Sequence, residues 1–418
     1  MPERLHREPF DLLLPQELRP FSPAETEKAL GMEIAEHEEA RTLSVCGDAM
    51  QEVGIAIVGC GYWGQNLVRN FWELEDACVR VACDTSAEAL GRTNRRYPTI
   101  ELSGSFEDVV RHPGVDAVVL ATPVSTHYPL AKIALKADKH VLVEKPLAEK
   151  SSQVSELTEI AERQQRVLMV DHTFLYSPAV QRMKELIESG EIGELLYYDS
   201  VRINLGLVQS DTNVLWDLGP HDFAIMDFLC GQEPRSVTST AVRHMNCPYE
   251  TMAYVTARFD SSLVAHFHLN WLAPVKVRRT LIGGSRKMLV YDDMEPSEKV
   301  KVYDRGFVTN HSPERRARIL TDYRNGDMQA PHLEATEALR RMAREFIDSI
   351  RQNRPPLTNG QAAGRVVRLL EAAQQSICNG GREVTLPAQG FASALVRNRG
   401  ASKLLTGGDQ DGFLSSCT

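Results

Sequence analysis

The sequence predicts an α/β protein in which a doubly wound parallel sheet is followed by a second α/β domain with a large open, mainly antiparallel sheet. Two observations predict this fold class. From residue 53 to about residue 172, short apolar runs alternate with segments of helical period, as in parallel sheets covered by helices. From about residue 236 the hydrophobic period becomes two, which is typical of antiparallel strands with one exposed face.

The first strand and the turn after it carry a nucleotide-binding motif. Residues 53–58 are apolar and β-branched, as buried parallel strands are, and they lead into a complete G-x-G-x-x-G, Gly59-Cys60-Gly61-Tyr62-Trp63-Gly64. In this motif Gly59 allows the tight turn, Gly61 lets the backbone approach a pyrophosphate, and Gly64 permits close helix–strand packing. Helical spacing follows, so Tyr62 and Trp63 lie at a helix N-terminus, which favours anionic phosphates. The stretch predicts a Rossmann dinucleotide-binding domain.

The second strand, residues 79–83, indicates which dinucleotide is bound. It ends at Asp84, about 20 residues after the motif, where a carboxylate accepts hydrogen bonds from the adenosine ribose hydroxyls. Thr85 and Ser86 follow, rather than an arginine that would accommodate a 2′-phosphate. We therefore expect NAD as the cofactor, with NADP less favoured.

Later strands of this domain also end in polar residues. The strand at 115–120 precedes Thr122 and a helix, the strand at 141–143 precedes Glu144 and Lys145, and a helix at 152–165 leads to a strand at 167–170. Ligands bind outside the carboxyl ends of such strands. Several residues are thus candidates to face one crevice: Gly59, Asp84, Thr122, Glu144, Lys145 and His172. Pro123 and His127, just after Thr122, are further candidates to contact the cofactor. A lysine there is suited to polarise a hydroxyl; the alternative is an exposed lysine that precedes a proline.

The second domain begins with a helix at 178–189 and a strand at 195–203 that carries Arg202. After a polar loop comes an apolar helix in which Asp217 and His221, four residues apart, share one side if the first turn is helical. Pro220 is tolerated there only if the helix has just begun. The alternative, with Asp217 as an N-cap, leaves His221 unexplained. Six β-rich segments follow from 236 to 303, then an irregular loop at 305–331 and helices at 333–351 and 364–378.

Composition excludes several classes of protein. The formal net charge of −9 gives no support for binding to nucleic acid or to an anionic membrane. No apolar run approaches the roughly 18–20 residues of a membrane span, and the charged N-terminus lacks a signal-peptide core, so we expect a cytoplasmic protein. The eight cysteines are scattered without a C-x-x-C pair, which favours reduced thiols and no metal site.

The two ends of the chain differ from the rest. Residues 1–50 contain eleven Asp and Glu against five Lys and Arg (11 − 5, net −6), and we expect an acidic extension that is solvated or loosely docked, with a subunit-contacting arm as the alternative. Residues 388–418 show few sustained patterns and predict a mobile tail. The expected organisation is thus an extension at 1–50, a Rossmann domain at 51–172, a substrate-binding and oligomerisation domain at 173–387, and a tail at 388–418.

These motifs resemble the glucose–fructose oxidoreductase / inositol dehydrogenase family (Gfo/Idh/MocA) over about residues 53–385. The resemblance rests on five features: the glycine motif, Ala121-Thr122-Pro123 with His127, Glu144-Lys145-Pro146, Asp217-Leu218-Gly219-Pro220-His221, and Pro356-Leu357-Thr358-Asn359-Gly360. It implies a Rossmann domain joined to a domain whose open sheet serves substrate binding and forms a homodimer or homotetramer. It also implies a catalytic lysine at Lys145 and a catalytic Asp/His pair at Asp217 and His221.

The sequences Gly61–Leu67 and Asn213–Asp217 most resemble the nucleotide-sugar branch of this family, which includes UDP-N-acetylglucosamine 3-dehydrogenases. On this hypothesis NAD oxidises a sugar ring hydroxyl, C3 of a UDP-N-acetylhexosamine or its uronate, to a ketone. His221 takes the hydroxyl proton, Lys145 hydrogen-bonds the alkoxide, and Asp217 orients the histidine or a neighbouring hydroxyl; lysine as the base is the alternative. Further candidates contact the sugar or its diphosphate: Tyr176, Arg202 and Trp216. For Arg202 the alternative is an ion pair on the sheet.

Three other functions stay open at the level of sequence. An inositol or free-sugar dehydrogenase would use the same Lys/His pair without a UDP group. An NAD-assisted glycosidase would release a hydrolysed product without net NADH. A non-enzymatic sugar sensor on this scaffold would be expected to lack Lys145 or His221, and both are present.

Overall fold

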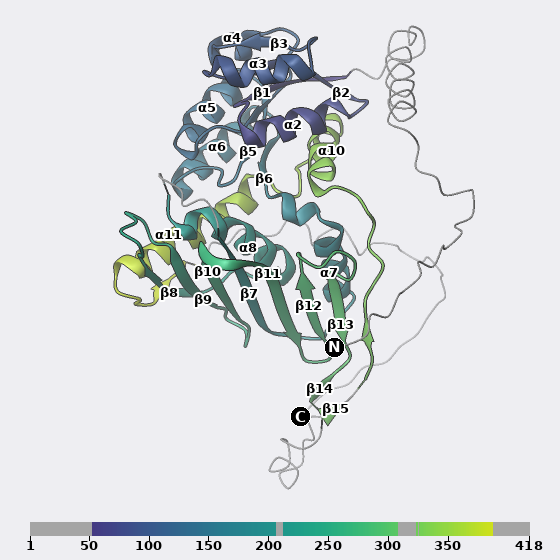
Figure 1. Ribbon diagram of the computed structural model, residues 1–418, viewed down its shortest axis with the longest axis vertical. Coiled ribbons are helices and arrows are strands. Elements are labelled where there is room, and N and C mark those ends of the chain that lie inside the picture. Colours follow the sequence, from purple (N-terminus) through teal and green to yellow (C-terminus); the bar gives the residue numbers. More distant parts are fainter. Residues whose placement is uncertain (1–51, 206–211, 308–322, 325, 388–418) are drawn as a thin grey trace, which may run out of the picture. The chain divides into compact units, whose positions relative to one another are not determined.

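The computed structural model describes residues 52–205, 212–307, 323–324 and 326–387 (Figure 1). The acidic extension and the tail expected at the two ends lie outside the described residues, as does most of the loop expected at 305–331. None of the helices in the described ranges is long and apolar enough to cross a membrane.

The first sheet has six parallel strands in the order β3-β2-β1-β4-β5-β6, the classical doubly wound arrangement with its switch point between β1 and β4. Its strands are β1 (Val53–Val58), β2 (Ala77–Cys83), β3 (Glu101–Ser103), β4 (Ala117–Leu120), β5 (His140–Glu144) and β6 (Leu168–Asp171). Every residue of β1, β4, β5 and β6 is buried, as expected for strands with both faces covered. The short β3 has two exposed residues and no apolar run, and it was not predicted.

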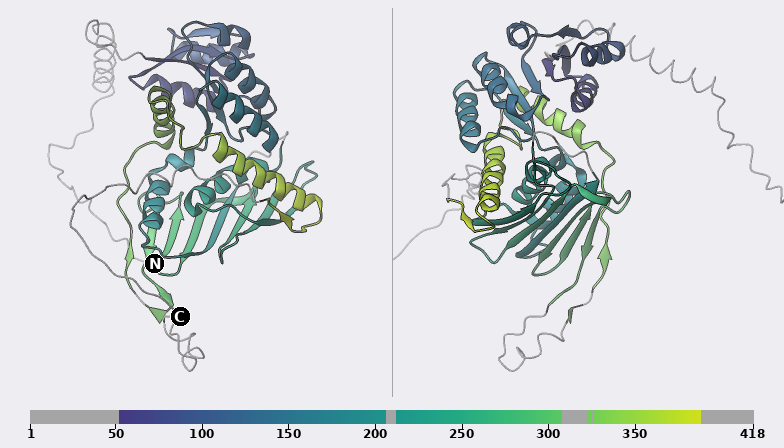
Figure 2. Two further views of the ribbon diagram at one scale, coloured as in Figure 1. Left: turned by 180° about the vertical axis from the view of Figure 1, so that it is seen from behind. Right: turned by 60° about the vertical axis from the view of Figure 1, so that its left-hand side comes forward.

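Helices connect these strands and cover the sheet (Figures 1 and 2). They are α2 (Tyr62–Trp72), α3 (Ala87–Arg96), α4 (Phe106–Arg111), α5 (Val124–Lys136) and α6 (Ser151–Arg163). Ser86 and Ser105 cap α3 and α4 through their hydroxyl oxygens. The prediction of a parallel α/β sheet is confirmed, with most boundaries within two residues of those expected.

The second sheet has nine strands in the order β16-β13-β12-β11-β7-β10-β9-β8-β17. Only β7 and β10 pair in parallel, so the sheet is mixed and mainly antiparallel, as predicted. Its strands are β7 (Leu195–Leu205), β8 (Ser236–Val242), β9 (Met252–Arg258), β10 (Val264–Asn270), β11 (Leu272–Gly284), β12 (Met288–Asp292), β13 (Val300–Tyr303), β16 (Met328–Gln329) and β17 (Val384–Thr385). A separate pair is formed by β14 (Gly306–Phe307) and β15 (Tyr323–Arg324).

The two faces of this sheet differ. Along β10 the buried residues Ala265, Phe267 and Leu269 alternate with His266 and His268, which are half-buried. The buried face packs against α8 (Val214–Cys230) and α11 (Gly360–Cys378). In Figure 2 the described helices lie on one side of this sheet and leave its other face uncovered. An open face is what the sequence predicts.

Three further elements follow the first sheet in the chain or pack against its domain. The 3₁₀ turn η2 (Thr173–Tyr176) and α7 (Pro178–Glu188) follow β6, and α10 (Ala338–Arg351) packs on both η2 and α2. Phe346 of α10 meets Phe71 of α2 edge to face, with ring centroids 6.2 Å apart. Late helices of the chain thus pack on the Rossmann domain.

The late loop is tied to the edge of the first sheet. The backbone N–H of Val170 in β6 donates to the Thr358 carbonyl oxygen at 2.9 Å, and the Thr358 hydroxyl donates to the Val170 carbonyl oxygen at 2.7 Å. Asn359 then caps α11 by accepting from the backbone N–H of Ala362. This explains why a Thr-Asn-Gly sequence precedes the last helix.

Candidate active site

The glycine motif forms a backbone cradle at the start of α2. Gly59 adopts a φ of +91°, a conformation that favours glycine. A Cβ at Gly64 would lie 1.8 Å from the Gly59 carbonyl oxygen, so only glycine lets α2 approach β1 this closely. A Cβ at Gly61 would meet nothing within 4 Å, which leaves open space beside the helix N-terminus. These residues fit the pyrophosphate of a dinucleotide.

Side chains around the cradle suit the rest of that cofactor. Asp84, at the end of β2, is half-buried and accepts hydrogen bonds from the backbone N–H groups of Cys60 (2.6 Å) and Ser86 (2.7 Å), which fix its carboxylate beside the glycine turn. Tyr62 and Trp63 are 88% and 44% exposed at the first turn of α2. Two large aromatic side chains left in solvent at this position are available to cover a bound ligand.

His127 joins two loops of the site. Its ring is 1% exposed, with Nδ1 2.8 Å from the carbonyl oxygen of Pro146 and Nε2 2.8 Å from that of Thr122. Burial lowers its pKa from the usual value. The histidine therefore connects the turn after β4, which continues through Pro123 into α5, to the turn after β5. Its place is behind these loops, so we regard it as a positioning residue for the cofactor side.

Lys145 reaches from the end of β5 to α8. Its Nζ donates to the backbone carbonyl oxygen of Asp217 at 2.8 Å and lies 3.4 Å from the Asp217 carboxylate. The other oxygen of that carboxylate accepts from Trp271 Nε1–H at 3.0 Å. Lys145 precedes Pro146 through a cis peptide bond. The sequence hypothesis is that Asp217 orients His221 or a neighbouring hydroxyl; in the structure the Asp217 side chain contacts Lys145 and Trp271.

His221 lies one turn beyond Asp217 on α8. The helix begins at Val214, capped by the Asn213 side chain, so the first turn is helical and Pro220 lies further inside the helix than expected. Burial, and then the positive charges of Lys145, Arg202 and Arg278, lowers the pKa of His221 well below 6.5. Its Nδ1 is buried without a hydrogen-bond partner among the described residues. The ring is therefore neutral near pH 7, and the ring of Phe174 packs edge-on against it at 5.0 Å.

Beneath Lys145 lies a pair of acids, of which the sequence pointed only to Glu144. Glu144 and Asp171 face each other across β5 and β6, and they are 7% and 3% exposed. Burial, and then the charge of Asp171, raises the pKa of Glu144 well above its usual value, and burial raises that of Asp171. Two buried carboxyl groups this close share a proton rather than both ionise. The pair thus places about one negative charge below Lys145.

His172 follows Asp171, and it too is closed off from solvent. Neither ring nitrogen has a hydrogen-bond partner within the part of the chain that the structure describes, and burial lowers its pKa to about 3. The sequence placed His172 at a strand end without a role. The charge of Lys145 also lowers the pKa of His172, and His172 in turn contributes to the lowered pKa of His221. We therefore regard His172 as part of the wall of the site.

Arg202 is brought near His221, but as a member of a buried ion pair. It is 5% exposed, and its Nε donates to Asp222 at 2.5 Å while Ser200 donates to the other Asp222 oxygen at 2.7 Å. The sequence left open an ion pair on the sheet surface as the alternative to a diphosphate contact, whereas this pair is buried between β7 and α8. Trp216 lies half-buried in the first turn of α8, one residue before Asp217.

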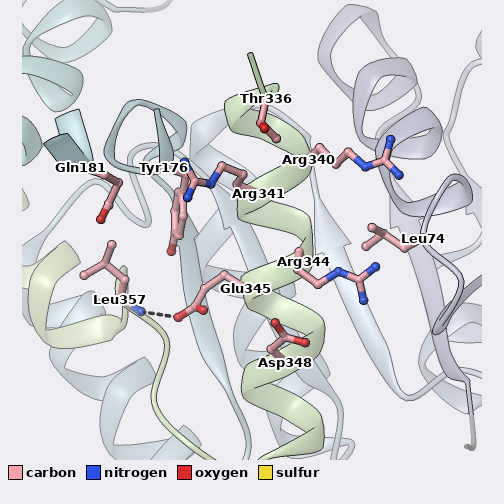
Figure 3. Close-up of a pocket in the computed structure, with 10 residues that line it drawn as sticks. All are labelled: Leu74, Tyr176, Gln181, Thr336, Arg340, Arg341, Arg344, Glu345, Asp348 and Leu357. Atoms are coloured by element: carbon pink, nitrogen blue, oxygen red, sulfur yellow. Dashed lines mark hydrogen bonds between the residues drawn. The ribbon is translucent and has the colours of Figure 1, made fainter. Parts of the chain in front are cut away.

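Tyr176 points away from the catalytic candidates. It is 6% exposed, its hydroxyl is 3.0 Å from that of Thr358, and it lines a cavity of about 390 Å³ between η2 and α10 (Figure 3). Arg341, Arg344 and Glu345 line the same cavity, whereas Lys145, Asp217 and His221 do not. We therefore do not carry Tyr176 forward as a sugar-binding residue.

Taken together, these features define a class of protein. A glycine cradle with an acid at the end of β2 lies on the same sheet edge as a lysine, and that lysine contacts a helix that carries a neutral histidine. Such an arrangement suits a dinucleotide-dependent oxidoreductase that acts on an alcohol.

Comparison with known families agrees. The model described as "Oxidoreductase family, NAD-binding Rossmann fold" matches residues 53–172, and the "GFO/IDH/MocA C-terminal domain" model matches residues 180–290. The two matches together span more than half of the sequence, and the chain belongs to the Gfo/Idh/MocA oxidoreductase family. It is an NAD-dependent dehydrogenase with an NAD-binding Rossmann domain, as the sequence predicts.

Individual relatives differ in what their names state. The chain is 23% identical over 344 residues to the uncharacterized oxidoreductase YrbE of Bacillus subtilis (strain 168), covering 79% of this chain and 96% of that one. It is 31% identical over 164 residues to glycosyl hydrolase family 109 protein 2 of Shewanella sp. (strain ANA-3), but this match covers 37% of this chain and 36% of the relative.

Solved structures show the same fold over nearly their whole length. A putative oxidoreductase from Magnetospirillum magnetotacticum MS-1 is 27% identical with a TM-score of 0.67, covering 77% of this chain and 99% of that one. The UDP-N-acetylglucosamine 3-dehydrogenase GnnA from Acidithiobacillus ferrooxidans is 21% identical with a TM-score of 0.67, covering 78% and 98%. GenD2 from gentamicin A biosynthesis, in complex with NAD, is 22% identical with a TM-score of 0.68, covering 83% and 100%.

Proposed function

We propose that the protein oxidises a ring hydroxyl of a sugar to a ketone, and that its substrate is a UDP-N-acetylhexosamine or the corresponding uronate oxidised at C3. The observation that carries the proposal is the contact between Lys145 and α8. It joins the lysine at the end of β5 to the backbone of Asp217, one turn before His221. The similarity in fold to a UDP-N-acetylglucosamine 3-dehydrogenase supports the choice of sugar.

In this mechanism His221 is the general base. Because its pKa lies well below 6.5, the ring is neutral and one nitrogen is free to accept a proton at physiological pH. Its Nδ1 faces the buried side, so Nε2 is the nitrogen assigned to the substrate hydroxyl. The proton moves from that hydroxyl to Nε2 as the alcohol is oxidised.

Lys145 supplies the positive group for the oxygen. Its Nζ is held by the Asp217 carbonyl and carboxylate, and Trp271 holds the carboxylate in turn. In this position Nζ donates to the substrate oxygen as negative charge develops there. NAD, when bound, would supply the hydride acceptor for the carbon that carries this oxygen. The residues that hold NAD in this proposal form the cradle and its surroundings: Gly59, Gly61, Tyr62, Trp63, Gly64, Asp84, Thr122, Pro123, Glu144 and Lys145.

The open face of the second sheet is the surface that we assign to self-association. Large apolar side chains are exposed on this face at Tyr197, Val242 and Tyr254. Clusters of this kind mark protein contact surfaces more often than isolated exposed residues do. We propose a homodimer or homotetramer through this face, tested by light scattering of the purified protein and of a Tyr254→Lys variant, which is expected to shift toward monomer.

A glycosidase is the second candidate, because several matches at 27–31% identity are to glycosyl hydrolase family 109 proteins. Each of these matches covers 37% of this chain and 36% of the relative. An NAD-assisted glycosidase regenerates its cofactor and releases a free sugar, so the two functions differ in their products.

The test is NADH formation at 340 nm with purified protein, NAD and a panel of UDP-sugars, myo-inositol and free hexoses. Adding 2-oxoglutarate detects recycled cofactor as 2-hydroxyglutarate. NADH or 2-hydroxyglutarate formed with UDP-N-acetylglucosamine or its uronate, and lost in Lys145→Ala, supports the proposal. Turnover confined to inositol or a free hexose contradicts the choice of substrate, and release of UDP with a free sugar identifies a glycosidase.

A further inference from the structure

A row of charged residues crosses the covered face of the second sheet beside His221. Arg202 on β7 and Arg278 on β11 are direct partners in the strand register, and Asp293 follows β12 on the far side of Arg278. Like charges directly opposite each other destabilise a sheet unless each is compensated. The compensation differs between the two arginines.

Arg202 has a counter-ion of its own within the protein. It is almost completely buried, and its Nε–H forms a one-to-one ion pair with Asp222, which is equally buried. A ligand that displaced Arg202 from Asp222 would leave a buried carboxylate unpaired, which is strongly unfavourable.

Arg278 is different because its counter-ion is shared. Asp293 lies 3.2 Å from Arg278 and 3.3 Å from Lys299, and Tyr291 also donates to it at 3.1 Å. Burial alone would raise the pKa of Asp293, but Lys299 and Arg278 outweigh burial and lower it. Two cations thus share one ionised carboxylate, and the side chains of Arg278 and Lys299 are 32% and 35% exposed. This end of the row carries an excess positive charge that solvent reaches.

Phe174 sets the position of Arg278 relative to the reacting group. The ring of Phe174 lies edge-on against His221, at a centroid distance of 5.0 Å. The guanidinium carbon of Arg278 lies 5.4 Å from the centre of the same phenyl ring, and that of Arg202 lies 4.6 Å from it. The Arg278 guanidinium and the His221 ring thus lie against the same phenyl ring. The positive charge of Arg278 also helps to lower the pKa of His221.

We propose that Arg278 is a specificity residue that binds an anionic oxygen group of the substrate, a carboxylate or a phosphate. This inference rests on the proposed function, and it names the chemical class of the substrate: a sugar that carries negative charge next to its ring. The planar guanidinium, oriented by Asp293 and stacked on Phe174, presents paired N–H donors to such a group. The distribution of charge supports a substrate orientation with the anionic group at Arg278, because the acid pair Glu144 and Asp171 lies at the Lys145 end of the site, away from Arg278.

The experiment compares Arg278→Met, Arg278→Lys and Arg279→Met in the full chain. Arg279 is the next residue on the same strand and is exposed on the opposite face of the sheet, so it controls for loss of charge and for the strand itself. Four sugars are tested with NAD: UDP-N-acetylglucosamine, its uronate, N-acetylglucosamine and N-acetylglucosaminuronate. Binding is measured by calorimetry and turnover by steady-state kinetics.

For Arg278→Met we expect KM and Kd for anionic sugars to rise roughly ten- to a hundredfold, with a smaller change in kcat, because a hydrogen bond to a charged group is lost. Arg278→Lys recovers part of the affinity, and Arg279→Met leaves it unchanged. A loss for both UDP-sugars assigns the contact to phosphate, and a loss for the two uronates assigns it to the carboxylate.

Two results would overturn the proposal. One is equal affinity of wild type and Arg278→Met for all four sugars. The other is a wild-type protein that binds none of the anionic sugars. If the wild type oxidises only neutral sugars, and Arg278→Met does so equally well, the dehydrogenase function stands and the role of Arg278 falls. If anionic sugars bind in an Arg278-dependent way without NADH formation, the role of Arg278 stands and the proposed oxidation falls.

Discussion

The cofactor side and the substrate side of the site are built in different ways. On the cofactor side each candidate follows the end of its own strand, as Gly59, Asp84, Thr122 and Lys145 do, and the parallel sheet brings these ends to one edge. On the substrate side, Phe174, Arg202 and Arg278 come from a turn and two strands far apart in the sequence. They meet only because of the register of β7 against β11 and the packing of η2 on α8. The first kind of site is local in sequence, and the second depends on tertiary pairing.

The largest effect is expected where the two sides meet. Lys145→Ala removes the only described cation that bonds the backbone of α8 at Asp217, and we expect kcat to fall about 10²–10⁴-fold, a larger effect than the accompanying loss of NAD affinity. Steady-state kinetics and NAD titration measure the two quantities separately. Lys136→Ala, at an exposed position of α5, is the matched control. Equal activity of the two variants would remove Lys145 from the mechanism.

A pair of glycine variants tests the cofactor side by itself. Gly64→Ala places a Cβ 1.8 Å from the Gly59 carbonyl oxygen, so we expect a lower Tm and loss of NAD binding together. Gly61→Ala meets no protein atom, so we expect an unchanged Tm and an NAD affinity lower by about tenfold or more. Thermal unfolding with and without NAD separates these outcomes. A drop in Tm for Gly61→Ala of the same size as for Gly64→Ala would contradict the assignment of a pyrophosphate cradle.

Two buried histidines test how far the site extends along the sheet. Burial lowers the pKa of His172, after β6, to about 3 and that of His140, at the start of β5, to about 4. Below pH 6.5 these histidines bind protons in the unfolded chain but not in the folded chain, so the free energy of unfolding falls as the pH decreases. For each histidine the slope is about 1.4 kcal/mol per pH unit. We expect His172→Asn and His140→Asn each to flatten this slope, from about pH 6.5 down to their respective pKa values.

Denaturant titrations between pH 4 and pH 7 measure the slope. Turnover distinguishes the two histidines, because only His172 lies at the carboxyl edge beside His221. A change in kcat for His140→Asn equal to that for His172→Asn would show that the effect is one of general stability.

The smallest effect is expected for Trp271→Phe. This change removes the indole N–H that holds the Asp217 carboxylate, and it keeps an aromatic ring in the core. One neutral-to-charged hydrogen bond is lost, so we expect kcat to fall about threefold to tenfold with NAD affinity unchanged. Kinetics at saturating NAD test this, and no change in kcat would mean that Asp217 holds Lys145 without help from Trp271.

What the sequence could predict also differs between the cofactor side and the substrate side of the site. The parallel sheet and the glycine cradle could be predicted because each has a local pattern of apolar runs, glycines or strand ends, whereas the roles of Lys145, Asp217 and His221 were implied by the family resemblance and stay a proposal. The partner of Asp217 could not, since Trp271 lies 54 residues away and only strand packing brings its N–H to the carboxylate. Arg278 belongs to no sequence motif. The two-residue hydrophobic period around it predicts a strand, but it does not indicate which residues of the neighbouring strands Arg278 pairs with. Asp171 and His172 follow a strand end, but their burial became visible only with the neighbouring strands in place.

The most direct test of the account uses UDP-N-acetylglucosamine, or its uronate, with deuterium at C3. With wild-type protein and NAD, the account predicts that deuterium appears in NADH and that turnover slows relative to the unlabelled sugar. Retention of the label on the sugar, with no labelled NADH at any time in a single turnover, would contradict oxidation at C3.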